Sequence, residues 1–261
     1  MIPATVVGMA LALGSLIAMM LLEGSSPLAV ILLPPLVLVF GATFGAAVAG
    51  STMADLRKLG SWFRMAFGPD EASTTVSLIA QLVELATLAR KEGMLPLENR
   101  ARSVEDPFLR RGLQLAIDAV PIDQLRHVLE REIDATRADD LVAARFFAKM
   151  GGYAPTIGII GTVMSLVHVL ENLAEPAALG HSIAAAFVAT LWGILSANVI
   201  WLPLGARIRR ISDLECTQME MTLEGLLAVQ AGANPRLVGE RLRSLLPDVP
   251  EGKVKPKSKA A

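Results

Sequence analysis

Hydrophobic and polar positions divide the chain into two pairs of apolar stretches and two polar regions. The apolar stretches contain no Lys or Arg and cover residues 2–22, 28–50, 153–173 and 183–204. A helix rises 1.5 Å per residue, so about 20 apolar residues span the ~30 Å hydrocarbon layer of a bilayer. The pattern therefore predicts four transmembrane helices.

The distribution of basic residues predicts how these helices are oriented. Of the 24 Lys and Arg residues, 14 lie in residues 51–151 and 10 in residues 205–261, and the short link inside each pair has none. The positive-inside rule places such basic regions in the cytoplasm. We therefore predict a multi-pass protein of the cytoplasmic (inner) cell membrane with both termini in the cytoplasm. A hydrophobic content of 53% and a mean hydropathy of +0.51 agree with this class.

The predicted fold class is all-α, a polytopic membrane protein with four transmembrane helices and a helical cytoplasmic domain. Helical periodicity fills the polar regions, and Gly93, Asp106-Pro107 and Asn234-Pro235 mark helix ends and starts. From Ile122, one long helix is predicted to lead into the third span. The predicted segments are spans 1 and 2 (1–50), a cytoplasmic domain opening with an interfacial helix at 53–67 (51–151), spans 3 and 4 (152–204), further cytoplasmic helices (205–246) and a disordered lysine-rich tail (247–261).

Small and hydroxyl-bearing residues share one face in each of the last two spans. At helical spacing these faces comprise Pro155, Gly158, Thr162 and Ser165 in the third span, and Ala186, Thr190, Gly193 and Ala197 in the fourth. One interpretation is ordinary close packing, because small residues and Ser/Thr commonly join transmembrane helices. The other is that both faces surround something polar. The pattern alone leaves both open.

Candidate chemistry is sparse. The sequence has no Gly-rich phosphate loop, no paired His/Cys metal spacing and no Ser-His-Asp set, so we predict no enzymatic activity, no metal and no cofactor. Basic and acidic residues are balanced in residues 51–151, 14 against 15, which argues against nucleic-acid binding. The single cysteine, Cys216, cannot form an internal disulfide.

The interior of the predicted spans contains no carboxylate, because Glu23, Glu171 and Glu175 lie at the stretch ends or in the short links. Proteins that carry protons or cations across a membrane usually keep an intramembrane acid for that purpose. Either this chain moves no ions, or a partner subunit supplies the acid. The polar faces favour the second alternative.

An ordered set of motifs over almost the whole chain resembles the MotA/PomA family, the larger subunit of the bacterial flagellar stator. The motifs are Pro35 to Thr43, Ala89 to Leu95, Glu105 to Leu109, Tyr153-Ala154-Pro155 with Gly161 to Met164, Ala189 to Gly193, Ala197-Asn198, Leu202 to Leu204 and Asn234 to Arg236. The first span matches weakly, and the tail beyond Leu246 does not match.

This resemblance implies a homopentameric ring around two copies of a MotB-like partner that brings a transmembrane aspartate and a peptidoglycan-binding domain. Ion passage at the interface would turn the ring against a FliG-like rotor protein. The resemblance places the rotor contact at Arg90 and Glu98, and the coupling of ion passage to movement at Pro155 and Pro203. Without it, the first two would be ordinary solvated charges and the prolines ordinary helix kinks. Ser165 departs from the glycine often found there, with little expected consequence.

The resemblance implies that the translocated ion is H+ or Na+, and the residues favour Na+. Thr162 and Thr190 could offer hydroxyl oxygens, and Pro155 leaves a carbonyl one turn earlier without its helical donor. Sodium-type members resemble this chain in keeping both threonines. The alternative is that Thr162 merely bonds its own helix backbone.

Two other functions are alternatives: an energising subunit of another MotA/TolQ/ExbB-type complex, in transport or defence, and a self-sufficient transporter. An energiser of the ExbB/TolQ type has three spans in a different order, and a defence-system relative has a long cytoplasmic tail. A self-sufficient transporter predicts an inverted repeat and internal charges, neither of which is visible.

Overall fold

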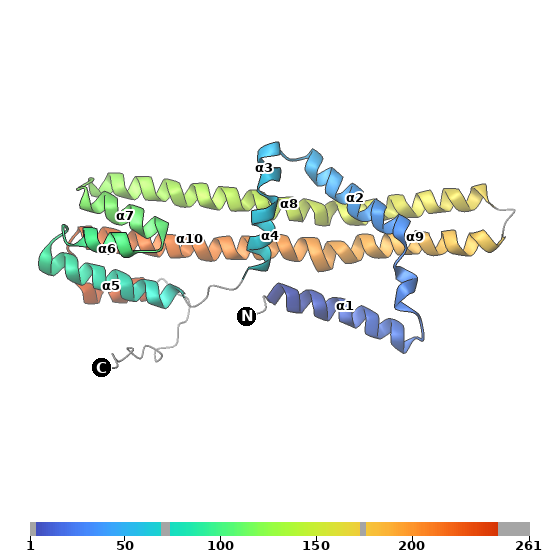
Figure 1. The fold of residues 1–261 in the computed structure, drawn as a ribbon, viewed down its shortest axis with the longest axis horizontal. Helices are drawn as coiled ribbons and strands as arrows, with labels where there is room; N and C mark the ends of the chain where they lie inside the picture. Colours follow the sequence, from blue (N-terminus) through green and yellow to red (C-terminus); the bar gives the residue numbers. More distant parts are fainter. Residues whose placement is uncertain (1–3, 69–73, 173–175, 245–261) are drawn as a thin grey trace. The chain divides into compact units, whose positions relative to one another are not determined.

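The computed structural model describes residues 4–68, 74–172 and 176–244, and their regular elements are all helical (Figure 1). The chain forms two compact units. Unit 1 comprises Met1–Asp70 and Thr136–Asp213, and unit 2 comprises Glu71–Ala135 and Leu214–Ala261. The predicted disordered tail lies outside the described residues.

Unit 1 contains the apolar helices. Its elements are α1 (Ala4–Leu22), the 3₁₀ turn η1 (Pro27–Val30), α2 (Leu33–Ala49), α3 (Met53–Arg57), α4 (Leu59–Phe67), residues 136–171 of α8 (Ile122–Glu171), α9 (Pro176–Ser196), the π-helix η2 (Ala197–Trp201) and residues 202–213 of α10 (Leu202–Gln230). Within this unit, α8 and the α9–α10 segment run side by side in opposite directions (Figure 1).

Three of the four predicted spans lie in helices that are long and apolar enough to cross a membrane, namely Ala4–Leu22, Ile122–Glu171 and Leu179–Gln230. The predicted second span, 28–50, differs because its helix, α2, begins only at Leu33 and has 17 residues. Pro34 and Pro35 explain this late start, since proline lacks an N–H and fits the first helical turn. At 1.5 Å per residue α2 is about 26 Å long.

Unit 2 is built around leucine side chains. Its elements are α5 (Thr74–Glu92), α6 (Leu97–Ser103), α7 (Pro107–Ile117), residues 122–135 of α8, residues 214–230 of α10 and α11 (Pro235–Ser244). The completely buried members of its core include Leu82, Leu97, Leu109, Leu113, Leu125, Leu129 and Leu226. The predicted helix signals are confirmed here: Gly93 ends α5 with φ +84°, and the Asp106 side chain accepts hydrogen bonds at the start of α7.

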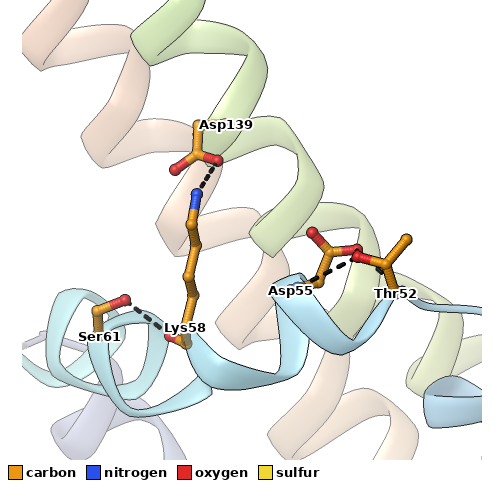
Figure 2. Close-up of polar contacts among 5 residues, drawn as sticks. All are labelled: Thr52, Asp55, Lys58, Ser61 and Asp139. Carbon is orange, nitrogen blue, oxygen red and sulfur yellow. Dashed lines mark hydrogen bonds and ion pairs between the residues drawn. The ribbon is translucent and has the colours of Figure 1, made fainter.

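The predicted interfacial helix at 53–67 is two helices, so the expectation of one continuous helix is wrong. Thr52 caps α3, and its hydroxyl donates to Asp55, which lowers the pKa of that carboxyl (Figure 2). The helix is interrupted at Lys58, whose backbone N–H donates to the Asp55 carbonyl in a tighter 3₁₀ pattern. The Lys58 ammonium then bonds Asp139 on α8 at 2.5 Å, which raises the pKa of Lys58.

The core of unit 1 outside the apolar helices is aromatic. Trp62 and Ala66 of α4 are buried against Phe146 and Phe147 of α8, together with Leu204 and Ile208 of α10. The rings of Trp62 and Phe146 lie 5.5 Å apart, and those of Phe63 and Phe147 lie 5.2 Å apart, edge to face. This cluster fixes which face of α4 points inward.

Candidate functional site: the α8–α9 seam

At the seam between α8 and α9, the backbones of the two helices approach each other closely at two glycines. A Cβ on Gly158 would lie 2.9 Å from the Ala189 carbonyl oxygen, and one on Gly193 would lie 2.8 Å from the Ala154 carbonyl oxygen. Only glycine permits such an approach. The predicted small-residue faces therefore meet each other directly, because Gly158 of one and Gly193 of the other are in contact.

The two threonines meet at this seam. The Oγ1 atoms of Thr162 and Thr190 lie 2.5 Å apart. Thr162 Oγ1 also lies 3.2 Å from the Gly158 carbonyl oxygen on its own helix and 3.1 Å from the Ala186 carbonyl oxygen on α9. One hydroxyl has a single proton, so Thr162 donates to one of these oxygens at a time and can accept from Thr190.

The sequence left two roles open for Thr162, a bond to its own helix backbone or an oxygen ligand, and the structure shows contacts compatible with each. Its hydroxyl bonds its own helix backbone, as buried threonine often does, and it also joins a cluster of oxygens from two helices. Four oxygens converge, two hydroxyl and two carbonyl. Uncharged oxygen ligands of this kind suit a hard cation, and both threonines are partly accessible rather than fully buried.

Pro155 lies inside α8 and is half-buried. It cannot donate to the Gly151 carbonyl, four residues earlier, so that oxygen lacks its helical partner. Pro203 lies at the start of α10, directly after the π-helix Ala197–Trp201, where the N–H of Leu202 bonds the Ala197 carbonyl. Both prolines thus sit where the regular α-helical bonding of their segment is interrupted, one on each side of the seam.

The predicted rotor-contact residues lie in unit 2 on either side of the turn at Gly93. Arg90 is in the last turn of α5 and Glu98 in the first turn of α6, and both are exposed. Glu98 bonds Arg102 one turn later at 2.8 Å. Within the described ranges no ion pair joins Arg90 to Glu98, so the fold leaves Arg90 directed at solvent and Glu98 in a weak exposed pair.

Sequence reasoning missed a polar pair in unit 1 outside the apolar stretches. Asp140 of α8 lies beside Ser212 of α10, which is buried. Desolvation and the neighbouring Asp139 raise the pKa of Asp140, while contact with Ser212 opposes this. Because Asp139-Asp140 reads as an ordinary charged stretch of helix, no sequence signal separates the half-buried acid from its neighbour.

In the part of the chain that the structure describes, no cluster of three or more His, Cys, Asp or Glu side chains could hold a metal. An all-helical integral membrane protein with a glycine-lined, hydroxyl-bearing helix pair is the class that this fold and seam define.

Comparison with known proteins gives the family. Residues 100–221 match the family model described as the MotA/TolQ/ExbB proton channel family. Motility protein A of Bacillus subtilis is 33% identical over 243 residues, 93% of this chain and 90% of the relative. The chain belongs to the MotA/TolQ/ExbB proton channel family.

Solved structures agree with this assignment. The fold matches the flagellar MotAB stator complex from Bacillus subtilis with a TM-score of 0.86 and 32% identity, covering 93% of this chain and 95% of that one. It matches C. jejuni MotAB with a TM-score of 0.87 and 26% identity, covering 97% of each chain. These similarities support a MotA-like stator subunit of the flagellar motor, as the motifs predicted.

Proposed function

We propose that this chain is the ring-forming subunit of an ion-driven stator in the cytoplasmic membrane. Five copies surround a MotB-like partner that carries a transmembrane aspartate and a peptidoglycan-binding domain. Helix α2 serves as the second of four spans despite its 17 residues, because shorter spans are accommodated by local bilayer thinning. Both termini lie in the cytoplasm, where the basic residues concentrate.

The oxygen cluster at Thr162 and Thr190 is the observation that carries the proposal. The seam offers ligand oxygens, whereas the interior of the apolar stretches offers no carboxylate to balance a cation or release a proton. A carboxylate from a partner helix completes the site. The ion then passes at the interface between the two subunits. Pro155 and Pro203 interrupt the regular hydrogen bonding of α8 and α10, so that each helix can bend as the ion passes.

Sodium is the ion that this cluster suits better. A proton needs only the partner's acid and a path of water, whereas Na+ must exchange its hydration shell for oxygens held close together. Thr162 and Thr190 present two hydroxyl oxygens within 2.5 Å of each other, next to two backbone carbonyls. The arrangement therefore supports Na+ over H+.

The test is motor speed against external sodium at fixed pH, in cells carrying the parent chain or Thr162→Ala. We expect speed to rise with sodium in the parent and to fall sharply at low sodium in the variant. Thr156→Ala is the matched control, because Thr156 is an exposed threonine of the same helix that bonds only the Tyr153 carbonyl. If speed ignores sodium in all three strains, the motor is driven by protons and Thr162 only packs the seam.

The rotor contact is a separate part of the proposal. Arg90 and Glu98 are exposed near one turn of unit 2, and a FliG-like rotor protein with complementary charges is the proposed partner. Arg90→Glu should impair swimming without changing the amount of membrane-inserted protein, and a charge reversal on the rotor should restore part of it. Arg236→Glu, which reverses an exposed charge on α11, elsewhere in unit 2, is the control. Normal swimming with both Arg90 and Glu98 reversed would exclude the contact.

A further inference from the structure

The helices α3 and α4, called here the juxtamembrane belt (Met53–Phe67), are held at the level where the apolar stretches end. Lys149 donates to the Gly50 carbonyl at 3.3 Å, just before the belt begins. Arg207 donates to the carbonyls of Ala66 at 2.6 Å and Gly68 at 2.7 Å, where the belt ends. These contacts fix both ends of the belt.

The two anchoring side chains lie next to predicted membrane boundaries. Lys149 precedes the apolar stretch that starts at Tyr153 by four residues, and Arg207 follows the end of the last stretch at Leu204 by three. At 1.5 Å per residue these offsets are about 5–6 Å along each helix axis. The belt therefore lies at the depth of the lipid headgroups.

The belt is also fixed in rotation. Trp62 and Ala66 are buried in the aromatic core of unit 1, and Lys58 bonds Asp139 on α8 (Figure 2). These inward contacts determine which residues face outward. Figure 2 shows the Lys58 side chain reaching from the break between the two helices to α8.

The outward face combines aromatic rings with free cations. Phe67 is 39% exposed, and its ring is parallel to that of Phe63, whose other contact is the buried Phe147 at 5.2 Å, so Phe63 lies at the edge of this face and Phe67 on it. Arg57 and Arg64 are exposed, and neither has a hydrogen-bond or ion-pair partner among residues 4–68, 74–172 and 176–244. Met53 is 74% exposed. Apolar side chains next to arginine are typical of helices that lie in a membrane interface.

Charge separates this level of the molecule from the rest of the polar chain. Residues 51–68, 136–151 and 205–213 of unit 1 carry nine Lys/Arg against four Asp/Glu. The described residues of unit 2, 74–135 and 214–244, carry eleven against fourteen. Among the described residues of the two units, the positive excess thus lies in unit 1, in the segments next to the apolar stretches, where anionic phospholipids attract basic residues.

We propose that the juxtamembrane belt binds anionic phospholipids of the inner leaflet, with Arg57 and Arg64 on the headgroup phosphates and Met53 and Phe67 among the upper acyl carbons. The proposal rests on the membrane placement given above and is independent of the ion and the rotor.

A second copy of the chain is a less suitable occupant of this face. It would bring the same positive band, and the acids of that band are already engaged or recessed. Asp55 bonds Thr52, Asp139 bonds Lys58, Asp140 is half-buried, and Asp213 also has a partner within the chain. Arg57 and Arg64 would therefore gain few partners from a neighbouring belt, whereas an anionic lipid supplies a phosphate to each.

The test is the melting temperature of the purified full chain in mixed micelles that contain increasing fractions of phosphatidylglycerol or phosphatidylcholine. We expect phosphatidylglycerol to stabilise the parent at lower mole fractions than phosphatidylcholine, and 500 mM NaCl, chosen as a high-salt condition, to weaken the difference. In Arg57→Gln/Arg64→Gln the half-saturating fraction of phosphatidylglycerol should rise about tenfold. Arg57→Lys/Arg64→Lys, which keeps both charges, should retain the preference.

Arg102→Gln/Arg236→Gln is the matched control, because it removes two exposed arginines that form only weak i,i+4 pairs in unit 2. Its lipid preference should equal that of the parent. Soluble glycerol phosphate should not stabilise any variant. Equal stabilisation of the parent by both lipids would overturn the proposal. Loss of ring assembly in the glutamine variant with unchanged lipid preference would also overturn it, and would assign the belt to contact between copies. Neither readout depends on motor rotation, so a failed stator assignment would be recognised separately.

Discussion

Units 1 and 2 are both helical, but their helices are held together by different means. In unit 1 the α8–α9 seam is lined by Gly158 and Gly193, and backbone atoms touch across it. In unit 2 the helices are separated by fully buried leucines, and a Cβ added to Gly225 would meet the Leu82 side chain, both methyl carbons and Cγ, rather than backbone. Helices therefore pack through close backbone contact in unit 1 and through large apolar side chains in unit 2.

The difference follows from the surroundings of each unit. In water, burying leucine removes apolar surface from solvent, and this drives association. In a bilayer the acyl chains are as apolar as leucine, so little is gained by that exchange, and close backbone contact and interhelical hydrogen bonds take its place. The Thr162–Thr190 contact is such a bond. The comparison predicts that removing side-chain volume destabilises unit 2 most, and that adding a methyl group at the glycine seam destabilises unit 1.

The largest effect is expected for Leu109→Ala in unit 2. Leu109 is completely buried in α7, so its removal leaves a cavity and should lower the free energy of unfolding by about 2–5 kcal/mol. Hydrogen exchange of α7 amides in the detergent-solubilised chain measures the change. Leu95→Ala, at a position that is 79% exposed, should change the exchange little. Equal effects at both sites would mean that unit 2 is not stabilised by its leucine core.

A smaller but more specific effect is expected for Gly158→Ala in unit 1. The new Cβ would lie 2.9 Å from the Ala189 carbonyl oxygen, and backbone cannot move aside without separating α8 from α9. The overpacking should cost about 1–3 kcal/mol, measured by unfolding in a titration with sodium dodecyl sulfate.

Two alanine substitutions sharpen this result. Gly152→Ala has nothing within 4 Å of the new Cβ and should stabilise the helix slightly. Gly225→Ala in unit 2 meets the Leu82 side chain, which can change rotamer more easily than backbone can move, so the gain in helix propensity should offset part of the overpacking. A cost at Gly225 as large as that at Gly158 would remove the distinction between the two seams.

A stabilising change of about 0.5–1 kcal/mol is expected for Ala119→Gly in unit 2. Ala119 has φ 55°, in the left-handed region, directly after α7, where the N–H of Val120 bonds the Leu115 carbonyl. Glycine adopts this conformation without the Cβ penalty. Ala135→Gly, an exposed alanine within α8, should instead destabilise the chain by about 1 kcal/mol. Thermal melts of both variants check the opposite signs.

The smallest effect is expected from Asp140→Asn and depends on pH. The pKa of Asp140 is raised from 3.8, so the folded chain binds this proton more tightly than the unfolded chain does. Its contribution to stability therefore falls as pH rises from about 3.8 through the raised pKa, and the loss is complete above it. Asp140→Asn should raise the melting temperature at pH 7 more than at pH 4. A pH-independent difference would show that burial does not raise the pKa of Asp140.

The fold was largely predictable from sequence because its signals are periodic and local. The apolar stretches, the cap at Asp106 and the turn at Gly93 each depend on residues close together in the chain. The faces containing Thr162 and Thr190 were predictable as faces, but their direct contact depends on the register of α8 against α9, which no single helix encodes. The break at Lys58 was missed because a tertiary partner, Asp139, lies 81 residues away.

The π-helix at Ala197–Trp201 has a consequence for sequence length. A π turn holds one residue more than an α turn, and each residue in an α-helix turns the chain by about 100°. Deleting one residue between Ala197 and Trp201 would therefore allow a regular α-helix, and the residues after it would keep nearly the same direction. Arg207 would still reach the carbonyls of Ala66 and Gly68. Deleting one residue from the regular helix between Leu202 and Arg207 would instead rotate Arg207 by about 100° and break both contacts. The π-helix is thus a place where the chain tolerates a change in length without losing its anchor.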